Sequence, residues 1–114
     1  MYPTWILFYI YGIFVLDTMY CDNIFYAEHA LTKMAERGIE PEEVEDIIKR
    51  GEMIKSYPED LPDPSCLLMG WADGRVLHVV VAKDILYENC IVVTAYEPDP
   101  NVWELDFKNK KIKP

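Results

Sequence analysis

The sequence predicts one α+β domain, with two N-terminal helices packed on one face of a four-stranded antiparallel meander sheet. Apolar residues recur at helical spacing as far as residue 50, and the pattern then changes to short alternating segments separated by turn residues. Helices therefore precede strands, without the β-α-β alternation that builds parallel sheets. A chain of 114 residues, 51% of them apolar, has room for one such core.

The first helix is predicted from Ile24 to Arg37, with Asn23 as its N-cap. Its apolar stripe has the spacing i, i+3, i+4 and i+7 and consists of Ala27, Ala30, Leu31 and Met34. Gly38 follows and ends the helix, because glycine readily takes the left-handed conformation of a C-terminal cap.

The second helix is predicted from Pro41 to Arg50. Proline suits the first helical position, because the N–H that it lacks would have no partner there. Charged residues at the two ends complement the helix dipole, namely Glu42, Glu43, Lys49 and Arg50. Val44, Ile47 and Ile48 form the buried face, and Gly51 ends the helix.

Four strands are predicted after Gly51, at Met53–Tyr57, Ser65–Ala72, Arg75–Ala82 and Cys90–Glu97. The pair Asp73-Gly74 joins the second and third strands, because aspartate followed by glycine favours a two-residue hairpin turn. Three prolines between residues 57 and 64 cannot donate ladder hydrogen bonds, so this segment is predicted to be a loop. Trp103 and Phe107 are expected on a returning arm that packs on the sheet edge or on the helices.

The chain is acidic, with a formal charge of -9 and 13 of its 20 acidic residues before residue 65. This charge opposes non-specific binding to nucleic acid, because affinity for phosphate comes mainly from lysine and arginine. A small basic tail at the C-terminus consists of Lys108, Lys110, Lys111 and Lys113. We expect Lys108 and Lys110 to contact a phosphate backbone or an acidic partner, or the tail to be only a solvated chain end.

Residues 1–18 form an apolar extension, and residues 19–114 form the single α+β domain. The apolar run of 12 residues from Trp5 to Leu16 is shorter than the roughly 20 residues that cross a bilayer. A secretory signal would begin with a positively charged region, but no lysine or arginine precedes Lys33. We prefer Met19 as the biological start, with the upstream stretch an over-extended reading frame; a weak membrane anchor is the alternative.

Three widely spaced cysteines and two histidines support neither a disulfide framework nor a zinc site. A reducing environment fits this cysteine usage best, so a cytoplasmic location is expected. The sequence contains no phosphate-binding loop, nucleophile elbow or zinc-protease motif. No metal ion and no cofactor are therefore expected.

Candidate functional residues lie on the predicted sheet. Strand alternation places Arg75 and His78 on opposite faces, and it places Thr94 and Tyr96 on one face with Val92. If the strand register puts His78 beside Tyr96, the sheet offers an imidazole, a phenol and a hydroxyl for acid–base chemistry. The alternative is a core histidine whose ring nitrogens bond a backbone carbonyl or Tyr96.

Two further candidates lie on the first predicted helix. His29 is opposite the apolar stripe, so it is expected to face solvent or to line the edge of a cleft. Arg37 is in the last helical turn, where the helix dipole alone explains a basic residue.

A series of short motifs resembles the bacterial domain-of-unknown-function family 4258 over residues 24–108. The motifs are His29-Ala30-Leu31, Glu36-Arg37-Gly38-Ile39, Tyr57-Pro58, Pro64-Ser65-Cys66-Leu67-Leu68, Gly74-Arg75-Val76-Leu77-His78-Val79-Val80, Val93-Thr94-Ala95-Tyr96 and Trp103. Each motif alone is weak, and their order along the chain makes the resemblance specific. The sequence departs from the family at Leu61, where relatives tend to carry a basic residue, and in its apolar extension.

The resemblance implies a RelE/barnase-like fold, similar to that of the RelE and MqsR mRNA interferase toxins. It also implies a partner, a zinc-finger antitoxin of the YgiT type, and RNA as substrate. The polar positions that match the family are His29, Arg37, Arg75, His78, Thr94 and Tyr96.

We therefore predict a toxin-like component of a bacterial toxin–antitoxin pair, which cleaves RNA without metal by attack of the 2'-hydroxyl. His78 is the expected acid or base, Arg75 or Arg37 holds the phosphate, and Thr94 and Tyr96 orient the substrate. The alternative function is a non-catalytic protein-interaction module of the same fold, which the acidic charge favours.

Overall fold

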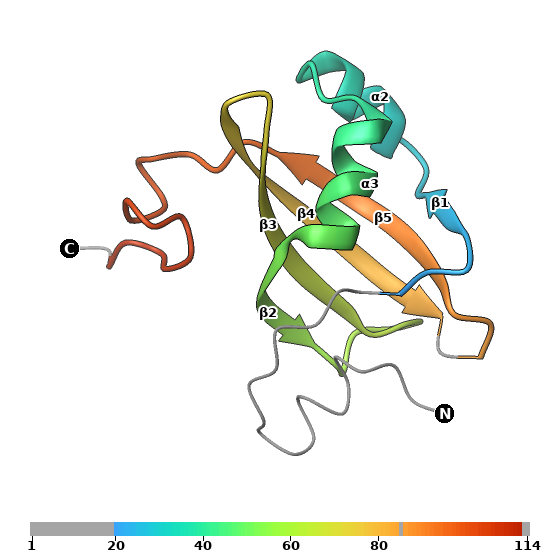
Figure 1. Ribbon diagram of the computed structural model, residues 1–114. Helices are drawn as coiled ribbons and strands as arrows, with labels where there is room; N and C mark the ends of the chain where they lie inside the picture. Colours follow the sequence, from blue (N-terminus) through green and yellow to red (C-terminus); the bar gives the residue numbers. More distant parts are fainter. Residues whose placement is uncertain (1–19, 85, 113–114) are drawn as a thin grey trace.

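The computed structural model describes residues 20–84 and 86–112, and the apolar extension 1–18 lies outside this part of the chain. Two helices pack against one twisted sheet (Figure 1). In chain order the elements are β1 (Ile24–Tyr26), α2 (Ala30–Glu36), α3 (Pro41–Arg50), β2 (Glu52–Tyr57), β3 (Ser65–Ala72), β4 (Arg75–Asp84) and β5 (Asn89–Tyr96). The strand order across the sheet is β1-β5-β4-β3-β2.

The sheet has five strands and is mixed, so the predicted four-stranded antiparallel meander is wrong. The additional strand is β1, which pairs in parallel with β5 in a register that sets Ile24 opposite Cys90 and Tyr26 opposite Val92. Its sequence, Ile-Phe-Tyr, is β-branched and aromatic and suits a strand better than a helix. The helical spacing of nearby apolar residues concealed this short segment.

The first helix is consequently shorter than predicted, and its N-cap is not Asn23. The chain turns at His29, which has a left-handed φ of 71°, and α2 runs only from Ala30 to Glu36. Two residues of the predicted stripe, Ala30 and Met34, are buried, whereas Leu31 remains 49% exposed. Gly38 follows the helix with a φ of 67°, as expected for its C-terminal cap.

The second helix has the predicted bounds and the predicted buried face. Val44, Ile47 and Ile48 of α3 are almost fully buried against the sheet. They meet an apolar layer formed by Cys66, Leu68, Leu77, Val79, Val81, Cys90, Val92 and Ala95. This layer is the hydrophobic core, and it fixes the sheet face that the helices cover (Figure 1).

Close packing between α3 and β3 requires a glycine at position 70. A Cβ atom there would lie 2.6 Å from Cγ1 of Ile47, closer than packed carbon atoms approach. We expect Gly70→Ala to lower the free energy of unfolding by about 1–3 kcal/mol, measured by denaturant unfolding, because α3 must shift. Leu105→Ala, at a 94% exposed position, is the control and should change it by less than about 0.5 kcal/mol.

A β-bulge in β5 changes which of its residues share a face. Val81 is opposite Val92, but Val80 is opposite Thr94, so Val93 is the extra residue. Val92 therefore packs in the helix-covered core, whereas Thr94 and Tyr96 lie on the other face. The prediction that Val92 shares a face with Thr94 and Tyr96 was wrong, because simple alternation does not hold across a bulge.

Cys21 and Cys90 form a disulfide, which corrects the prediction of unpaired cysteines. The parallel pairing of β1 with β5 brings together two cysteines that are 69 residues apart in sequence. Spacing along the chain gives no sign of such a contact. The argument from cysteine usage for a cytoplasmic location therefore no longer holds.

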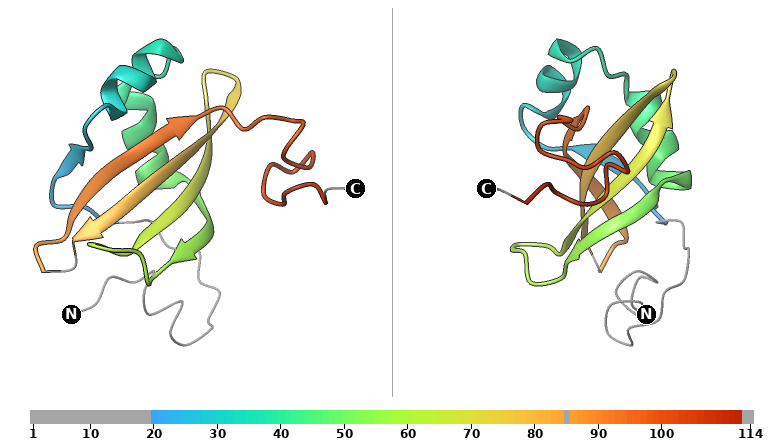
Figure 2. Two further views of the ribbon diagram at one scale, coloured as in Figure 1. Left: turned by 180° about the vertical axis from the view of Figure 1, so that it is seen from behind. Right: turned by 90° about the vertical axis from the view of Figure 1, so that its left-hand side faces the viewer.

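Residues 97–112, which we call the C-terminal arm, cross the sheet face opposite α3 (Figure 2, right). Trp103 of the arm is 6% exposed, and an isolated bridge joins it to Lys110. The prediction that the arm packs on the sheet edge or on the helices is therefore wrong, because Trp103 and Phe107 contact His78 on the middle strand of the sheet. In the described ranges, no helix is long and apolar enough to cross a membrane.

Candidate functional site

His78 lies at the centre of the sheet face that the arm covers. The β4–β5 register sets it directly opposite Tyr96, and its side chain is fully buried. The imidazole Nε2 is 2.7 Å from the backbone oxygen of Phe107, and Nδ1 is 3.3 Å from the hydroxyl of Tyr96. The Trp103 ring packs edge-on against the imidazole, with 4.6 Å between ring centroids.

These contacts identify the tautomer of the neutral His78 ring. A backbone carbonyl can only accept, so Nε2 carries the proton and donates it to Phe107. Nδ1 is then the acceptor for the Tyr96 hydroxyl. Burial lowers the pKa of His78, although its hydrogen bond to Phe107 opposes that shift. The ring is neutral, and both nitrogens are occupied.

The Tyr96 hydroxyl is correspondingly held in its protonated form. Burial raises the pKa of Tyr96, so the phenol acts as a donor to His78. Thr94, two residues earlier on the same face, accepts a hydrogen bond from Arg37 Nη1 at 3.2 Å. The same nitrogen donates to the Ala95 carbonyl at 2.9 Å, beyond the point where β1 ends its pairing with β5.

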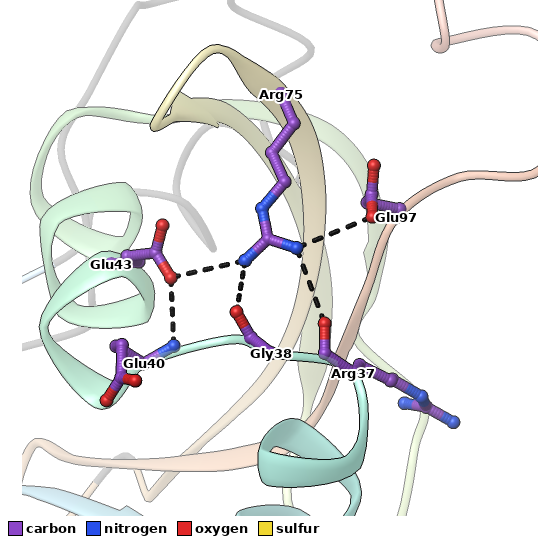
Figure 3. A network of polar contacts seen from close by, with 6 residues as sticks. All are labelled: Arg37, Gly38, Glu40, Glu43, Arg75 and Glu97. Atoms are coloured by element: carbon purple, nitrogen blue, oxygen red, sulfur yellow. Dashed lines mark hydrogen bonds and ion pairs between the residues drawn. The ribbon is translucent and has the colours of Figure 1, made fainter.

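Arg75 lies on the other side of the sheet and connects the two helices (Figure 3). Its Nη2 atom is 2.5 Å from the Gly38 carbonyl and 3.3 Å from Glu43 Oε1. Its Nη1 atom is 3.3 Å from the Arg37 carbonyl and 3.4 Å from Glu97 Oε2. The guanidinium thus holds the chain between α2 and α3 against the start of β4.

The structure therefore brings some sequence-predicted site residues together and separates others. His78 contacts Tyr96 across β4 and β5, and Arg37, at the end of α2, separately contacts Thr94 and Ala95 of β5. Arg75 does not contact His78, and its guanidinium bonds the backbone oxygen of Arg37.

The remaining predicted residues lie away from these contacts. His29 is exposed at the start of α2, with its Nε2 3.6 Å from Glu28. Lys108 is 2.7 Å from Glu52 Oε2, and the Lys110 amine lies 5.6 Å from the centre of the Trp103 ring. These two lysines fold back onto the domain. In the described part of the chain, no three metal-ligating side chains converge on one point.

Sequence analysis missed two features of this region. Glu43 is an acceptor for Arg75, but its place in the first helical turn already explained a glutamate there. Lys83 is 1% exposed within β4. Its burial could have been predicted from strand alternation, because Lys83 continues the buried series Leu77, Val79 and Val81.

Comparisons with known proteins give one family. Residues 26–97 match the family described as Domain of unknown function (DUF4258). This chain belongs to the DUF4258 family. No curated protein and no solved structure matches it. The matched segment runs from the last residue of β1 to the residue after β5, so it contains both helices, strands β2 to β5 and His78, but not the part of the arm that covers His78.

Proposed function

We propose that this DUF4258 domain is a protein-binding module that acts by contact and not by catalysis. The observation that carries the proposal is the state of His78, which is buried, neutral and occupied at both ring nitrogens. A general acid or base needs a ring nitrogen within reach of the reacting group. Arg75, one of the two arginines expected to hold the phosphate, bonds the Gly38 carbonyl and does not contact His78. The charge of -9 also disfavours an RNA substrate.

A groove beside α2 is the proposed contact site. It has a volume of about 310 Å³ and is lined by Leu31, Met34, Ala35, Gly38, Ile39, Glu40 and Pro41. Leu31 presents about half of its surface to solvent at the groove. Such a groove accepts apolar anchors from an amphipathic segment.

Charge favours a basic segment of a partner protein as the occupant. Residues 28–50 contain seven acidic and four basic residues. Two of the bases, Lys33 and Arg50, are paired with Glu36 and Asp46. The groove itself includes Glu40, whose side chain is exposed. Lysine or arginine flanking the apolar anchors would complement this surface.

The test uses a synthetic amphipathic helix of leucine and lysine, and the same peptide with glutamate in place of lysine. We expect the lysine peptide to bind the full chain, more weakly at high salt, and the glutamate peptide not to bind. Leu31→Lys should abolish binding, because it removes the anchor contact and adds a like charge. Leu86→Lys, at another exposed leucine, should leave binding unchanged. Equal binding of both peptides, or retained binding by Leu31→Lys, would overturn this site.

A toxin-like ribonuclease is the second candidate, favoured by the contacts along β4 and β5. His78 bonds Tyr96, and Arg37 bonds Thr94, two residues before Tyr96 on the same strand. This chemistry requires the C-terminal arm to leave His78, because Trp103 and Phe107 now occupy its surroundings. A zinc-finger antitoxin of the YgiT type would be its partner.

Induced expression in bacteria separates the two candidates. We expect normal growth and intact messenger RNA with the full chain and with Trp103→Ala, which loosens the arm. Growth arrest with RNA cleavage, abolished by His78→Ala in soluble protein, would establish the ribonuclease. Cleavage only by Trp103→Ala would show an active site that the arm closes.

A further inference from the structure

Lys83 places an amine inside the domain where a core residue is expected. It lies in β4 opposite Cys90, on the face covered by the helices, and is 1% exposed. An ammonium group has three donors, and the Tyr20 carbonyl accepts from it here. The Tyr20 ring also lies over the amine, with its centre 5.7 Å from Nζ.

The segment that covers this amine is attached to β5 by the disulfide. Tyr20 directly precedes Cys21, which is bonded to Cys90. Two backbone hydrogen bonds also hold this segment. The Asp22 N–H donates to the Glu88 carbonyl and the Cys90 N–H donates to the Asn23 carbonyl, both at 2.8 Å. The disulfide is therefore the covalent link that keeps Tyr20 over Lys83.

Burial and neighbouring charges act on the Lys83 amine in opposite directions. Burial lowers the pKa of Lys83, and the opposing influences come from Glu88, Asp22 and Cys66. Burial also raises the pKa of Cys66 to about 12, so this thiol stays protonated and does not compete as a nucleophile. An unprotonated amine attacks carbonyl carbon directly.

We propose that Lys83 is a latent modification site for acyl donors, such as thioesters, and that reduction of the Cys21–Cys90 disulfide opens it. Reduction by a dithiol transfers two electrons and two protons to the disulfide, which becomes two thiols while the dithiol becomes a disulfide. The released Tyr20 segment then leaves the amine. Lys83 Nζ forms an amide bond with the acyl carbon, the carbon–sulfur bond breaks, and the thiol that leaves takes the proton.

The test measures acylation of the full chain by an acetyl active ester, with and without a phosphine reductant, followed by peptide mass spectrometry. We expect reduction to accelerate acylation of Lys83 by about tenfold or more, because a buried amine reacts only after local opening. Lys49 and Lys55, which are exposed, should react at the same rate in both states. The double variant Cys21→Ser with Cys90→Ser should acylate Lys83 rapidly without reductant.

The same double variant distinguishes local opening from unfolding. Its single remaining thiol is Cys66, which is fully buried in the core. Cys66 should stay unreactive toward a maleimide while Lys83 is acylated. Unchanged acylation of Lys83 after complete reduction would overturn the proposal. So would acylation of Lys83 that appears only together with labelling of Cys66.

Discussion

Replacing Arg75 by alanine should lower the free energy of unfolding by about 2–3 kcal/mol, as measured by denaturant unfolding. The guanidinium is 25% exposed and contacts two backbone carbonyls and two carboxylates. Its removal leaves the Gly38 and Arg37 carbonyls without this donor and leaves Glu43 without its cation. The expected loss is smaller than for a fully buried pair, because water reaches part of this cluster.

Two matched variants make the Arg75 result specific. Arg75→Lys should recover only part of the loss, because a lysine is a point charge and does not reproduce the planar fork. Arg50→Ala removes an exposed arginine that pairs with Asp46 at 3.1 Å, and it should cost about 0.5 kcal/mol or less. Unchanged stability of Arg75→Ala, together with lost RNA binding, would instead support the phosphate-binding role that the sequence suggests.

The elements that sequence predicts well are those with complete local signals. Helix α3 has a proline at its start, a charge pattern along its length and a glycine at its end, and its bounds match the prediction. The hairpin of β3 and β4 turns at Asp73-Gly74, where both residues have positive φ. These signals lie within a few residues of the structure that they specify.

The features that sequence misses depend on contacts between distant segments. Strand β1 exists because β5 offers it a parallel edge, and the disulfide follows from that pairing. The bulge at Val93 appears only once β4 and β5 are aligned. No local pattern records which partner a three-residue strand will find.

The candidate site also contains features that local sequence predicts and features that depend on distant contacts. Alternation separates Arg75 from His78 correctly, because the bulge is in β5 and β4 itself has no extra residue between Arg75 and His78. The His78–Tyr96 contact was conditional on a register that the sequence does not contain. The returning arm was predicted, but on the sheet edge or on the helices and not over His78, because Trp103 and Phe107 approach the sheet through an irregular segment.

The titration of His78 should report directly whether the arm stays on the sheet. Because burial lowers its pKa, the His78 ring should be less than half protonated at pH 6.5, where an ordinary histidine is half protonated. Nuclear magnetic resonance of the imidazole protons can follow this, since the chain has only two histidines. His29→Gln assigns the signals, and Trp103→Ala should move the pKa of His78 back toward its ordinary value.

The lowered pKa of His78 should also make the folded chain more stable at neutral than at acidic pH. The unfolded chain binds a proton at His78 near pH 6.5, whereas the folded chain binds it only at lower pH. The contribution of His78 to the free energy of unfolding is therefore complete above pH 6.5, and it is lost as the pH falls through the pKa of the folded state. Relative to His78→Gln, the wild-type chain should lose stability on acidification below about pH 6.5, and His29→Gln should behave like wild type.

An opposite result would change the proposed function. If His78 titrates at its ordinary value or above, the ring is solvated or faces a negative charge, and the arm does not hold it in solution. The imidazole would then be available beside Tyr96, as a ribonuclease requires. A lowered pKa with full stability at neutral pH keeps His78 in the core, where it serves to hold Phe107 and Tyr96 in place.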